Sequence, residues 1–313
     1  MSDASARDHG GRIDAAMARH GGTRGGWLDL STGINPVPYP MPALPTDAWT
    51  ALPDEGAFAK LEARARAFWR VPQDAAVLAV PGASAAIAQL PRCRPTGTVA
   101  IPGPTYNEHG AAFRASGWTL TEDATDALVA VHPNNPDGYI WTADRLPAPF
   151  TVIDESFCDV MPDASMIHLA ARPGTVVLKS FGKFWGLAGL RLGFAIGDPD
   201  VIRDLRDRLG PWQVSGPALA IGTEALADPE WADETRARLT EDAARLDTLL
   251  TAQGAVALGG TTLFRLYQVQ DAAAAQDRLA QAHVWSRTFP YATDWLRLGL
   301  PAPDRWAQLQ SAF

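Results

Sequence analysis

Residues 180–194 have the sequence SFGKFWGLAGLRLGF, with Lys183 shortly after an apolar run at 176–180. A short apolar run followed by a glycine-rich turn is typical of a buried strand that ends in a loop. A lysine held in a desolvated position there has a lowered pKa, so its neutral amine is available to form an imine with an aldehyde. From the residues alone, the alternative is a surface lysine in a glycine-rich loop.

Short apolar runs predict further buried strands. Together with 176–180 they lie at 76–80, 98–101, 127–131 and 150–153. Because the runs are continuous and alternate with helical patterns, they predict a mainly parallel sheet covered on both faces. Ligands in such sheets bind beyond the carboxyl ends of the strands, so the polar residues that follow each run are the candidates for chemistry.

The segments before and after the predicted sheet have other sequence patterns. The chain begins with a short helical stretch at 13–19 and a proline-rich run at 36–45, which predict an extended arm. A helix is expected at 58–68. After residue 198 the pattern is helical, with a long amphipathic stretch at 229–253, and strand-like runs at 262–267 and 295–300 predict a small α+β lobe.

The segment around Lys183 resembles the cofactor-lysine segment of fold-type I aminotransferases, whose consensus is close to S-x-x-K-x-x-G-L-x-G-x-R-x-G. The resemblance implies an α/β fold of the aspartate-aminotransferase type, with pyridoxal 5′-phosphate (PLP) carried on Lys183. It also implies a division of the chain. We expect an N-terminal arm at 1–45, a large PLP-binding domain at 46–205 and a small C-terminal domain at 206–313.

The same resemblance assigns further cofactor contacts. VIDESF at 152–157 resembles the D-E-A-[YF] motif, so Asp154 would hold the pyridine nitrogen protonated and make the ring an electron sink. HPNNPDG at 132–138 resembles the N-P-x-N-P-T-G loop, so Asn135 would bind the 3′ oxygen. PGPTYNEH at 102–109 places Tyr106 as the stacking ring. Read alone, these residues could be a turn aspartate, a turn asparagine and a core tyrosine.

PGASAAI at 81–87 opens a helix directly after a strand. Small residues there let backbone N–H groups at a helix N-terminus approach a phosphate, although the motif alone is no more specific than an ordinary N-cap. Within the resemblance, Ala83 and Ser84 form the phosphate cup with Ser180 and Arg191, and the guanidinium of Arg191 adds bidentate charge.

Four segments indicate the substrate. WLRLGL at 295–300 resembles the strand whose arginine binds the substrate α-carboxylate, which assigns Arg297 that role; an edge-strand salt bridge is the alternative. HGGR at 9–12 and DLSTGINP at 29–36 resemble the H-G-G-N and L-D-F-S-x-N-I-N-P-x-G segments of L-threonine-O-3-phosphate decarboxylases of cobalamin biosynthesis. GPWQVSGP at 210–217 resembles their P-W-x-V region. The implied ligands of the phosphorylated amino acid are His9, Gly33, Ile34 and Asn35, although a lone N-terminal histidine is ordinarily solvated.

This resemblance implies decarboxylation of L-threonine O-3-phosphate to (R)-1-aminopropan-2-yl phosphate. Two alternatives stay open: a PLP-dependent aminotransferase of the histidinol-phosphate type, and a non-catalytic scaffold for cobalamin assembly. The chain departs from the pattern at Arg12, where relatives have Asn, and at Phe157, which cannot donate the hydrogen bond of a tyrosine. It departs again at Leu52, where relatives have a Tyr that reaches the cofactor phosphate across a dimer.

Composition limits the partners. Lys and Arg total 27 against 35 Asp and Glu, a formal charge of −8, which argues against nucleic acid or an anionic membrane surface. Cys93 and Cys158 fit neither a disulfide framework nor a zinc spacing, so we expect no metal and a reducing, cytoplasmic location. The sequence has no signal-like or membrane-spanning apolar segment. The resemblance implies a homodimer with sites at the subunit interface.

Overall fold

The computed structural model describes residues 9–313. The chain divides into two compact units. One comprises the residues up to Val37 together with Ala237–Phe313, and the other is Pro38–Arg236. Strand β1 (Leu28–Asp29) pairs in parallel with β11 (Val284–Trp285), so the N-terminal residues fold with the C-terminal ones. This division into two units does not test the domain boundaries that the sequence predicts after residues 45 and 205, which stay predictions.

The Pro38–Arg236 unit is built on a seven-stranded sheet with the order β2-β8-β7-β6-β5-β3-β4. Neighbouring strands are parallel except at β8, which is antiparallel to both β2 and β7. The predicted mainly parallel sheet is therefore confirmed. The strands are β2 (Ala76–Val80), β3 (Thr98–Ala100), β4 (Thr119–Leu120), β5 (Ala127–Val131), β6 (Phe150–Asp154), β7 (Thr175–Ser180) and β8 (Gly193–Gly197).

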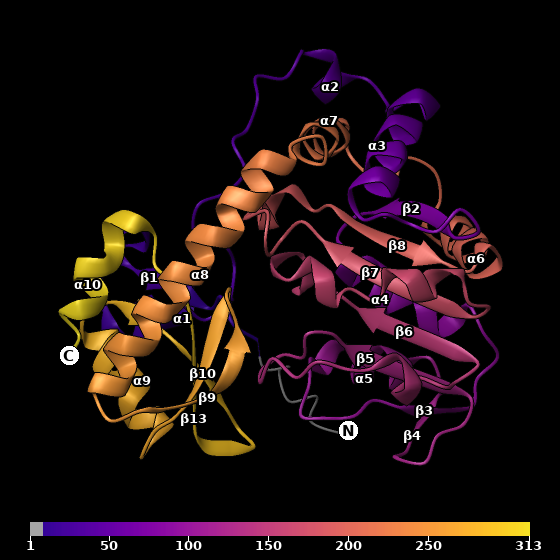
Figure 1. Ribbon diagram of the computed structural model, residues 1–313. Coiled ribbons are helices and arrows are strands. Elements are labelled where there is room, and N and C mark those ends of the chain that lie inside the picture. The colour runs from indigo at the N-terminus through magenta and orange to yellow at the C-terminus, as the bar shows by residue number, and fades with distance from the viewer. Residues whose placement is uncertain (1–8) are drawn as a thin grey trace. The chain divides into compact units, whose positions relative to one another are not determined.

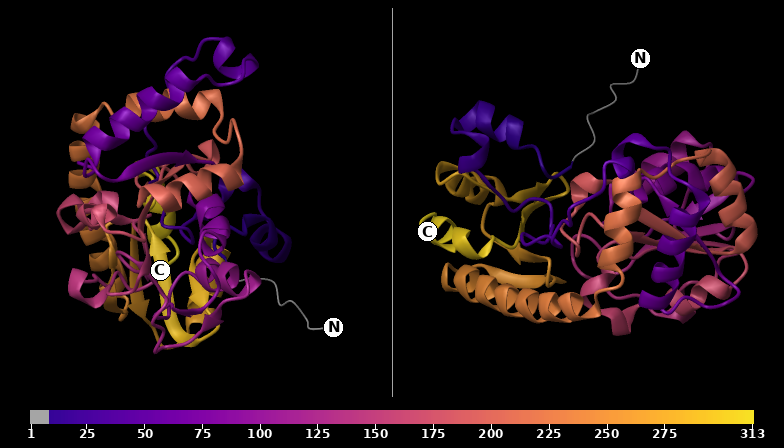
Figure 2. Two further views of the ribbon diagram at one scale, coloured as in Figure 1. Left: turned by 90° about the vertical axis from the view of Figure 1, so that its right-hand side faces the viewer. Right: turned by 90° about the horizontal axis from the view of Figure 1, so that it is seen from above.

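Helices lie on both sides of this sheet (Figures 1 and 2). The helices of this unit are α2 (Asp47–Thr50), α3 (Glu55–Phe68), α4 (Ala83–Gln89), α5 (Asn107–Ala115), α6 (Pro199–Leu209) and α7 (Gly216–Ala225), of which α2 packs against α7. Helix α4 packs against β7 and β8, and α6 packs against β2. Every residue of β6 and β8 is buried, as expected for strands covered on two faces. Helix α3 begins where the Asp54 side chain accepts a hydrogen bond from the Ala57 N–H, an N-cap.

The other unit contains an antiparallel sheet with the order β12-β13-β10-β9. The predicted runs at 262–267 and 295–300 correspond to β10 and β13. The strands are β9 (Val256–Thr261), β10 (Phe264–Gln268), β12 (Arg287–Phe289) and β13 (Ala292–Gly299), and the helices are α1 (Ile13–His20), α9 (Ala272–Gln281) and α10 (Trp306–Gln310). Ile13 and Ala16 of α1 are buried with Trp27 and with Ala280 of α9. Helix α8 (Pro229–Ala252) contains the sequence boundary between the units.

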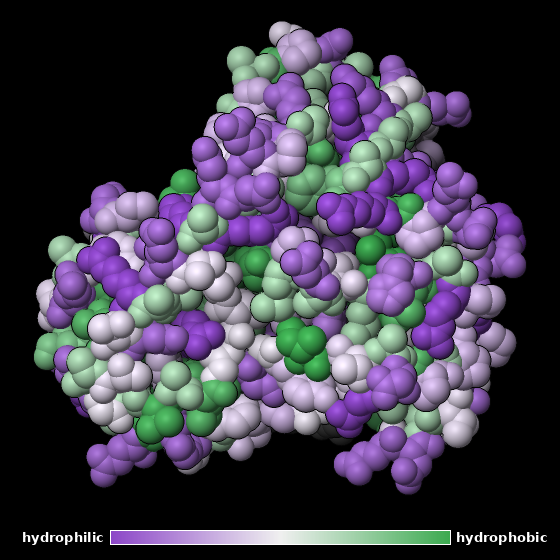
Figure 3. Space-filling model, in the orientation of Figure 1, coloured by the Kyte–Doolittle hydropathy of each residue, from purple (hydrophilic) through white to green (hydrophobic). Residues whose placement is uncertain are grey.

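Hydrophilic and hydrophobic residues are interspersed on the face shown in Figure 3. Large apolar side chains nevertheless remain exposed beside and within α2: Met41 at 72%, Trp49 at 69% and Leu52 at 66%. In the described part of the chain, no helix is both long enough and apolar enough to span a membrane.

Candidate active site

All eight predicted cofactor residues line one pocket of the Pro38–Arg236 unit. They are Ala83, Ser84, Tyr106, Asn135, Asp154, Ser180, Lys183 and Arg191. Val131, Asp154 and Ser180 end β5, β6 and β7, so the pocket opens at the carboxyl ends of parallel strands. The remaining lining residues are Ile87, Ser156, Phe157, Gly182 and Ala188.

The backbone around Lys183 is fixed by fully buried aromatic rings. Phe181, Phe184 and Trp185 are each 0% exposed, and Trp185 stacks on Phe181 with ring centroids 5.0 Å apart. The Gly186 N–H donates to the Lys183 carbonyl over 3.1 Å, which closes the turn. The Nζ atom of Lys183 lies 5.1 Å from the centroid of the Phe157 ring, on the wall of the pocket. A rigid aromatic base therefore presents the amine to the pocket.

Asp154 is buried and hydrogen-bonded through both oxygens. His109 Nε2 donates to Oδ2 over 2.8 Å, and the Ser156 backbone N–H and hydroxyl donate to Oδ1 over 3.0 and 2.5 Å. Burial alone would raise the pKa of Asp154, but the hydrogen bond and electrostatic interaction with His109, together with Ser156, outweigh it and hold the pKa below its ordinary value. Asp154 is therefore an anion at neutral pH. His109 and Ser156 support Asp154, and the sequence did not single them out.

The two adjacent asparagines have different environments. The Asn134 amide donates to the Pro104 carbonyl over 3.0 Å and to Asp137 over 2.8 Å, and its oxygen accepts from the Thr105 hydroxyl over 2.6 Å. Asn134 thus braces the loop, while Asn135 lines the pocket, as the sequence predicts. Tyr106 also lines the pocket, and its ring meets the His109 ring edge-on with centroids 6.1 Å apart.

The expected phosphate cup depends on two glycines. Arg191 Nη2 donates to Ser84 Oγ over 3.2 Å. A Cβ atom on Gly82 would lie 2.5 Å from Arg191 Nη2, and one on Gly193 would lie 2.5 Å from the Ala83 nitrogen. Arg191 itself has a left-handed backbone with φ of 55°, a strained conformation for a residue with a side chain. Only glycine at positions 82 and 193 leaves room for this cradle.

The donor set of the pocket matches each functional group of PLP. Lys183 would offer an amine to the aldehyde, the Asp154 anion would pair with the ring-nitrogen proton, and Asn135 would offer an amide to the 3′ oxygen. The cradle would offer a guanidinium, hydroxyls and small residues to the phosphate. The residues present fit the group.

Arg297 lies in the other unit, on β13, with a side chain that is almost fully buried. Arg287 on β12 is the cross-strand neighbour of Arg297. The guanidinium carbon of Arg297 lies 5.0 Å from the centroid of the Phe264 ring. Burial, followed by the positive charge of Arg287, lowers the pKa of Arg297 to about 9, although Tyr291 and Asp29 act in the opposite direction. Like charges directly opposite in a sheet are unfavourable, so an anion at Arg297 would relieve the repulsion.

The two N-terminal motifs meet beside Arg297. The Gly11 N–H donates to Ser31 Oγ over 2.7 Å, and Arg297 Nη2 donates to the Ser31 carbonyl over 2.7 Å. A Cβ atom on Gly299 would lie 3.3 Å from the Gly33 nitrogen, so Gly33 also lies against β13. The structure therefore brings the segment at 9–12 and the segment after β1 to the strand that carries Arg297.

Asn35 and Ile34 have less direct support as ligands. Asn35 is 2% exposed, and its side-chain oxygen accepts from the Val37 N–H over 3.0 Å and from Arg238 Nη2 over 2.7 Å. These contacts brace the turn. Ile34 is half-buried. The substrate contacts assigned to His9, Gly33, Ile34 and Asn35 stay predictions.

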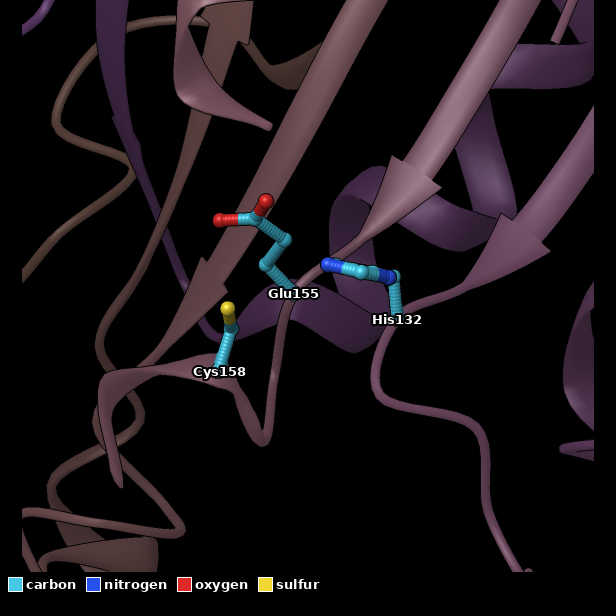
Figure 4. Close-up of side chains that lie close together, drawn as sticks. All are labelled: His132, Glu155 and Cys158. Carbon is cyan, nitrogen blue, oxygen red and sulfur yellow. The ribbon is translucent and has the colours of Figure 1, made fainter. Parts of the chain in front are cut away.

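His132, Glu155 and Cys158 lie close together just past the ends of β5 and β6, with ligand-type atoms within 4.8 Å of one another (Figure 4). His132 Nδ1 accepts from the Trp141 N–H over 3.1 Å, so its Nε2–H donates to the Ala164 carbonyl over 2.7 Å. Both imidazole nitrogens are occupied. Burial raises the pKa of the Cys158 thiol, which stays protonated.

Glu155 is also fully engaged. Its Oε1 accepts from the Met166 N–H over 2.5 Å, and its Oε2 accepts from Ser165 Oγ over 2.7 Å and pairs with Lys179 Nζ at 2.6 Å. The hydrogen bonds of His132 and Glu155 and the ion pair of Glu155 with Lys179 account for this cluster as a structural clamp.

A family model described as aminotransferase class I and II matches residues 118–307. The chain belongs to this family of PLP-dependent enzymes, as the pocket indicates. Among its relatives, the threonine-phosphate decarboxylase of Pseudomonas aeruginosa is 39% identical over 97% of this chain and 96% of the relative. That of a Sinorhizobium species is 41% identical over 95% and 93%. The solved histidinol-phosphate aminotransferase of Sinorhizobium meliloti, in complex with PLP, has the same fold, with a TM-score of 0.81 at 18% identity over 98% of this chain and 94% of that one.

Proposed function

We propose that this PLP-dependent enzyme decarboxylates L-threonine O-3-phosphate to (R)-1-aminopropan-2-yl phosphate. The observation that carries the proposal is one pocket lined by all eight residues assigned to the cofactor, in a chain that is similar over nearly its whole length to two threonine-phosphate decarboxylases. The N-terminal segment that resembles that of these decarboxylases is hydrogen-bonded to Ser31, whose carbonyl also accepts from Arg297, and this supports a substrate with both a carboxylate and a phosphate.

When bound, PLP supplies an electron sink for the pair released as a bond to the substrate Cα breaks. Lys183 would hold the cofactor and Arg191, Ser84, Ser180 and the N–H groups near Ala83 would hold its phosphate. Asp154, kept ionised by His109 and Ser156, would hold the proton on the ring nitrogen. Tyr106 would cover the ring and fix its plane.

In the proposed reaction the bond between Cα and the carboxylate carbon breaks and CO₂ leaves. Lys183 Nζ would then deliver one proton to Cα, which balances the reaction. Arg297 would orient the carboxylate before it leaves, and Arg287 would add positive charge near the substrate anions. A phosphate ligand role for His9 is part of this proposal.

The discriminating experiment mixes purified, PLP-loaded protein with L-threonine O-3-phosphate and measures released CO₂, with and without 2-oxoglutarate. We expect CO₂ release that does not depend on 2-oxoglutarate and that is lost in Lys183→Ala. Glutamate formation without CO₂ would instead identify an aminotransferase, and a wild-type protein with neither activity nor bound PLP would favour a scaffold.

We further propose that the chain acts as a homodimer, as the resemblance implies. The exposed Met41, Trp49 and Leu52 support an interface at α2, because aromatic and large apolar residues are enriched in interface cores. Leu52 stands where relatives have the tyrosine that reaches the partner's cofactor phosphate, so the phosphate would depend more on Arg191 and Ser84 of its own subunit.

A further inference from the structure

Ser31 lies at the centre of a hydrogen-bonded chain that leads from Arg297 to the N-terminal segment. Ser31 is 1% exposed. Its carbonyl accepts from Arg297 Nη2 over 2.7 Å, and its hydroxyl oxygen accepts from the Gly11 N–H over 2.7 Å. The same hydroxyl donates to Asp29 Oδ1 over 2.6 Å, and the Ser31 N–H donates to that oxygen over 2.9 Å. One residue thus contacts Arg297, the segment at 9–12 and the carboxylate of Asp29.

Close packing ties the segment to the same carbonyl that Arg297 holds. A Cβ atom on Gly10 would lie 2.4 Å from the Ser31 carbonyl oxygen, which is closer than side-chain carbon atoms come to oxygen. Gly11 has a φ of 80°, which favours glycine. Docking of residues 9–12 therefore requires the absence of side chains at both positions and the presence of the Ser31 carbonyl in its observed place.

Arg297 is the charged group in this arrangement that an anion would bind. Its guanidinium is buried opposite Arg287 and donates a hydrogen bond to the Ser31 carbonyl. An anion that binds Arg297 changes the forces on its guanidinium. Because the guanidinium is hydrogen-bonded to the Ser31 carbonyl, the change is passed to Ser31. By linkage, if docking of the segment favours anion binding, then anion binding favours docking by the same factor.

We propose that Ser31 is a positioning residue that couples the anion-binding Arg297 to the docking of the His9–Arg12 segment. The identity of the anion, the carboxylate of L-threonine O-3-phosphate, rests on the proposed function. The coupling itself rests on the contacts of Ser31. Its consequence is that the two ends of the substrate are bound together: occupation of Arg297 stabilises the segment that carries His9.

The test measures hydrogen exchange of the N-terminal peptide containing residues 9–12 in the full-length, PLP-loaded protein. Ser31→Ala removes the acceptor of the Gly11 N–H, and Gly10→Ala obstructs the close approach to the Ser31 carbonyl. Gly25→Ala is the matched control, because a Cβ atom there meets nothing within 4 Å. Without substrate, we expect exchange about tenfold faster in Ser31→Ala and Gly10→Ala, as for the loss of one hydrogen bond, and unchanged in Gly25→Ala.

The coupling is measured by adding L-threonine O-3-phosphate. We expect the substrate to slow exchange of this peptide in the wild type and in Gly25→Ala, but not in Ser31→Ala or Arg297→Lys, and KM for Ser31→Ala to rise at least about fivefold while kcat changes less. Ser31→Thr, which keeps the hydroxyl, should restore protection. Gly10→Ala alters only the N-terminal segment, so it tests docking even if Ser31→Ala does not fold.

The outcomes separate the two proposals. Exchange in Gly10→Ala and Ser31→Ala equal to that of the wild type would overturn the coupling, whatever reaction the protein catalyses. Substrate-induced protection that persists in Arg297→Lys would overturn it as well. If the exchange results are as expected but no CO₂ is released, the coupling stands and the decarboxylase assignment fails.

Discussion

Asp154 shows how single residues set the chemistry of the pocket. The pKa of an aspartate is about 3.9 in the unfolded chain, and in the fold the pKa of Asp154 is lower. A lowered pKa means that the ionised form contributes stability above the unfolded value, and that this contribution is lost as the pH falls through the folded value. Because the ring nitrogen needs an anion beside its proton, the same window governs retention of PLP.

His109→Leu removes the largest interaction that lowers the pKa of Asp154. We expect the pKa of Asp154 to rise, so that bound PLP is lost at a higher pH than in the wild type as the solution is acidified. At neutral pH we expect PLP affinity to fall about tenfold, because a hydrogen bond to a charged group is worth ~1.5–3 kcal/mol. The measurement is the visible absorbance of bound PLP as a function of pH. Identical acid profiles for the two proteins would contradict this role for His109.

At the residue scale, the sequence singled out residues that line one pocket but not the residues that support them. The eight cofactor residues belong to local motifs after strands, and all of them line the pocket. His109 is 45 positions from Asp154, and Arg287 acts through a cross-strand pairing with Arg297. No local pattern connects such partners, so only the fold could bring them together.

Strands β6 and β7 are joined beneath the pocket by a buried lysine. Lys179 Nζ of β7 pairs with Glu155 at 2.6 Å and with Asp159 at 3.5 Å, and all three side chains are nearly inaccessible to solvent. Burial would lower the pKa of Lys179, but the two carboxylates raise it overall. This cluster fixes the ends of the two strands that carry Asp154 and the Lys183 loop.

Lys179→Met would leave the carboxylates of Glu155 and Asp159 buried without their cation. We expect the free energy of unfolding to fall by about 3–5 kcal/mol, the usual effect of removing one partner from a buried pair. Urea denaturation monitored by fluorescence measures the change. Lys60→Met, at an exposed position of α3, is the control and should stay within about 0.5 kcal/mol of the wild type. Equal losses in the two variants would show that the buried pairs do not carry this stability.

The sequence predicted the strands that are encoded by continuous apolar runs. The apolar runs at 76–80, 127–131 and 150–153 match β2, β5 and β6 almost residue for residue. Strand β8 was not predicted, because Gly193 and Gly197 bound it and glycine ordinarily weakens a strand. Close packing requires glycine in this strand, since a Cβ atom on Gly197 would lie 2.1 Å from the Thr175 carbonyl oxygen. Strand β9 was missed because its first three residues are exposed and only its last residue is buried.

At the scale of the whole molecule, the exposed apolar residues at α2 bear on the proposed homodimer. We expect Trp49→Ala to raise the dimer dissociation constant about 30-fold or more, because a central interface tryptophan commonly contributes at least ~2 kcal/mol. Val256→Ala, which also truncates an exposed apolar side chain, should leave the dimer unchanged. Sedimentation velocity over a range of concentrations measures both. A wild-type protein that is monomeric throughout, or a Trp49→Ala dimer as tight as the wild type, would refute an interface at α2.

The central claim is that Lys183 returns a proton to Cα after CO₂ has left. The most direct measurement is the mass and NMR spectrum of the product formed from L-threonine O-3-phosphate in D₂O by the PLP-loaded protein. Our account expects 1-aminopropan-2-yl phosphate with one deuterium on the carbon that carried the carboxylate, and none formed by Lys183→Ala. A product that retains its carboxylate, with the amino group transferred to another acceptor, would contradict it.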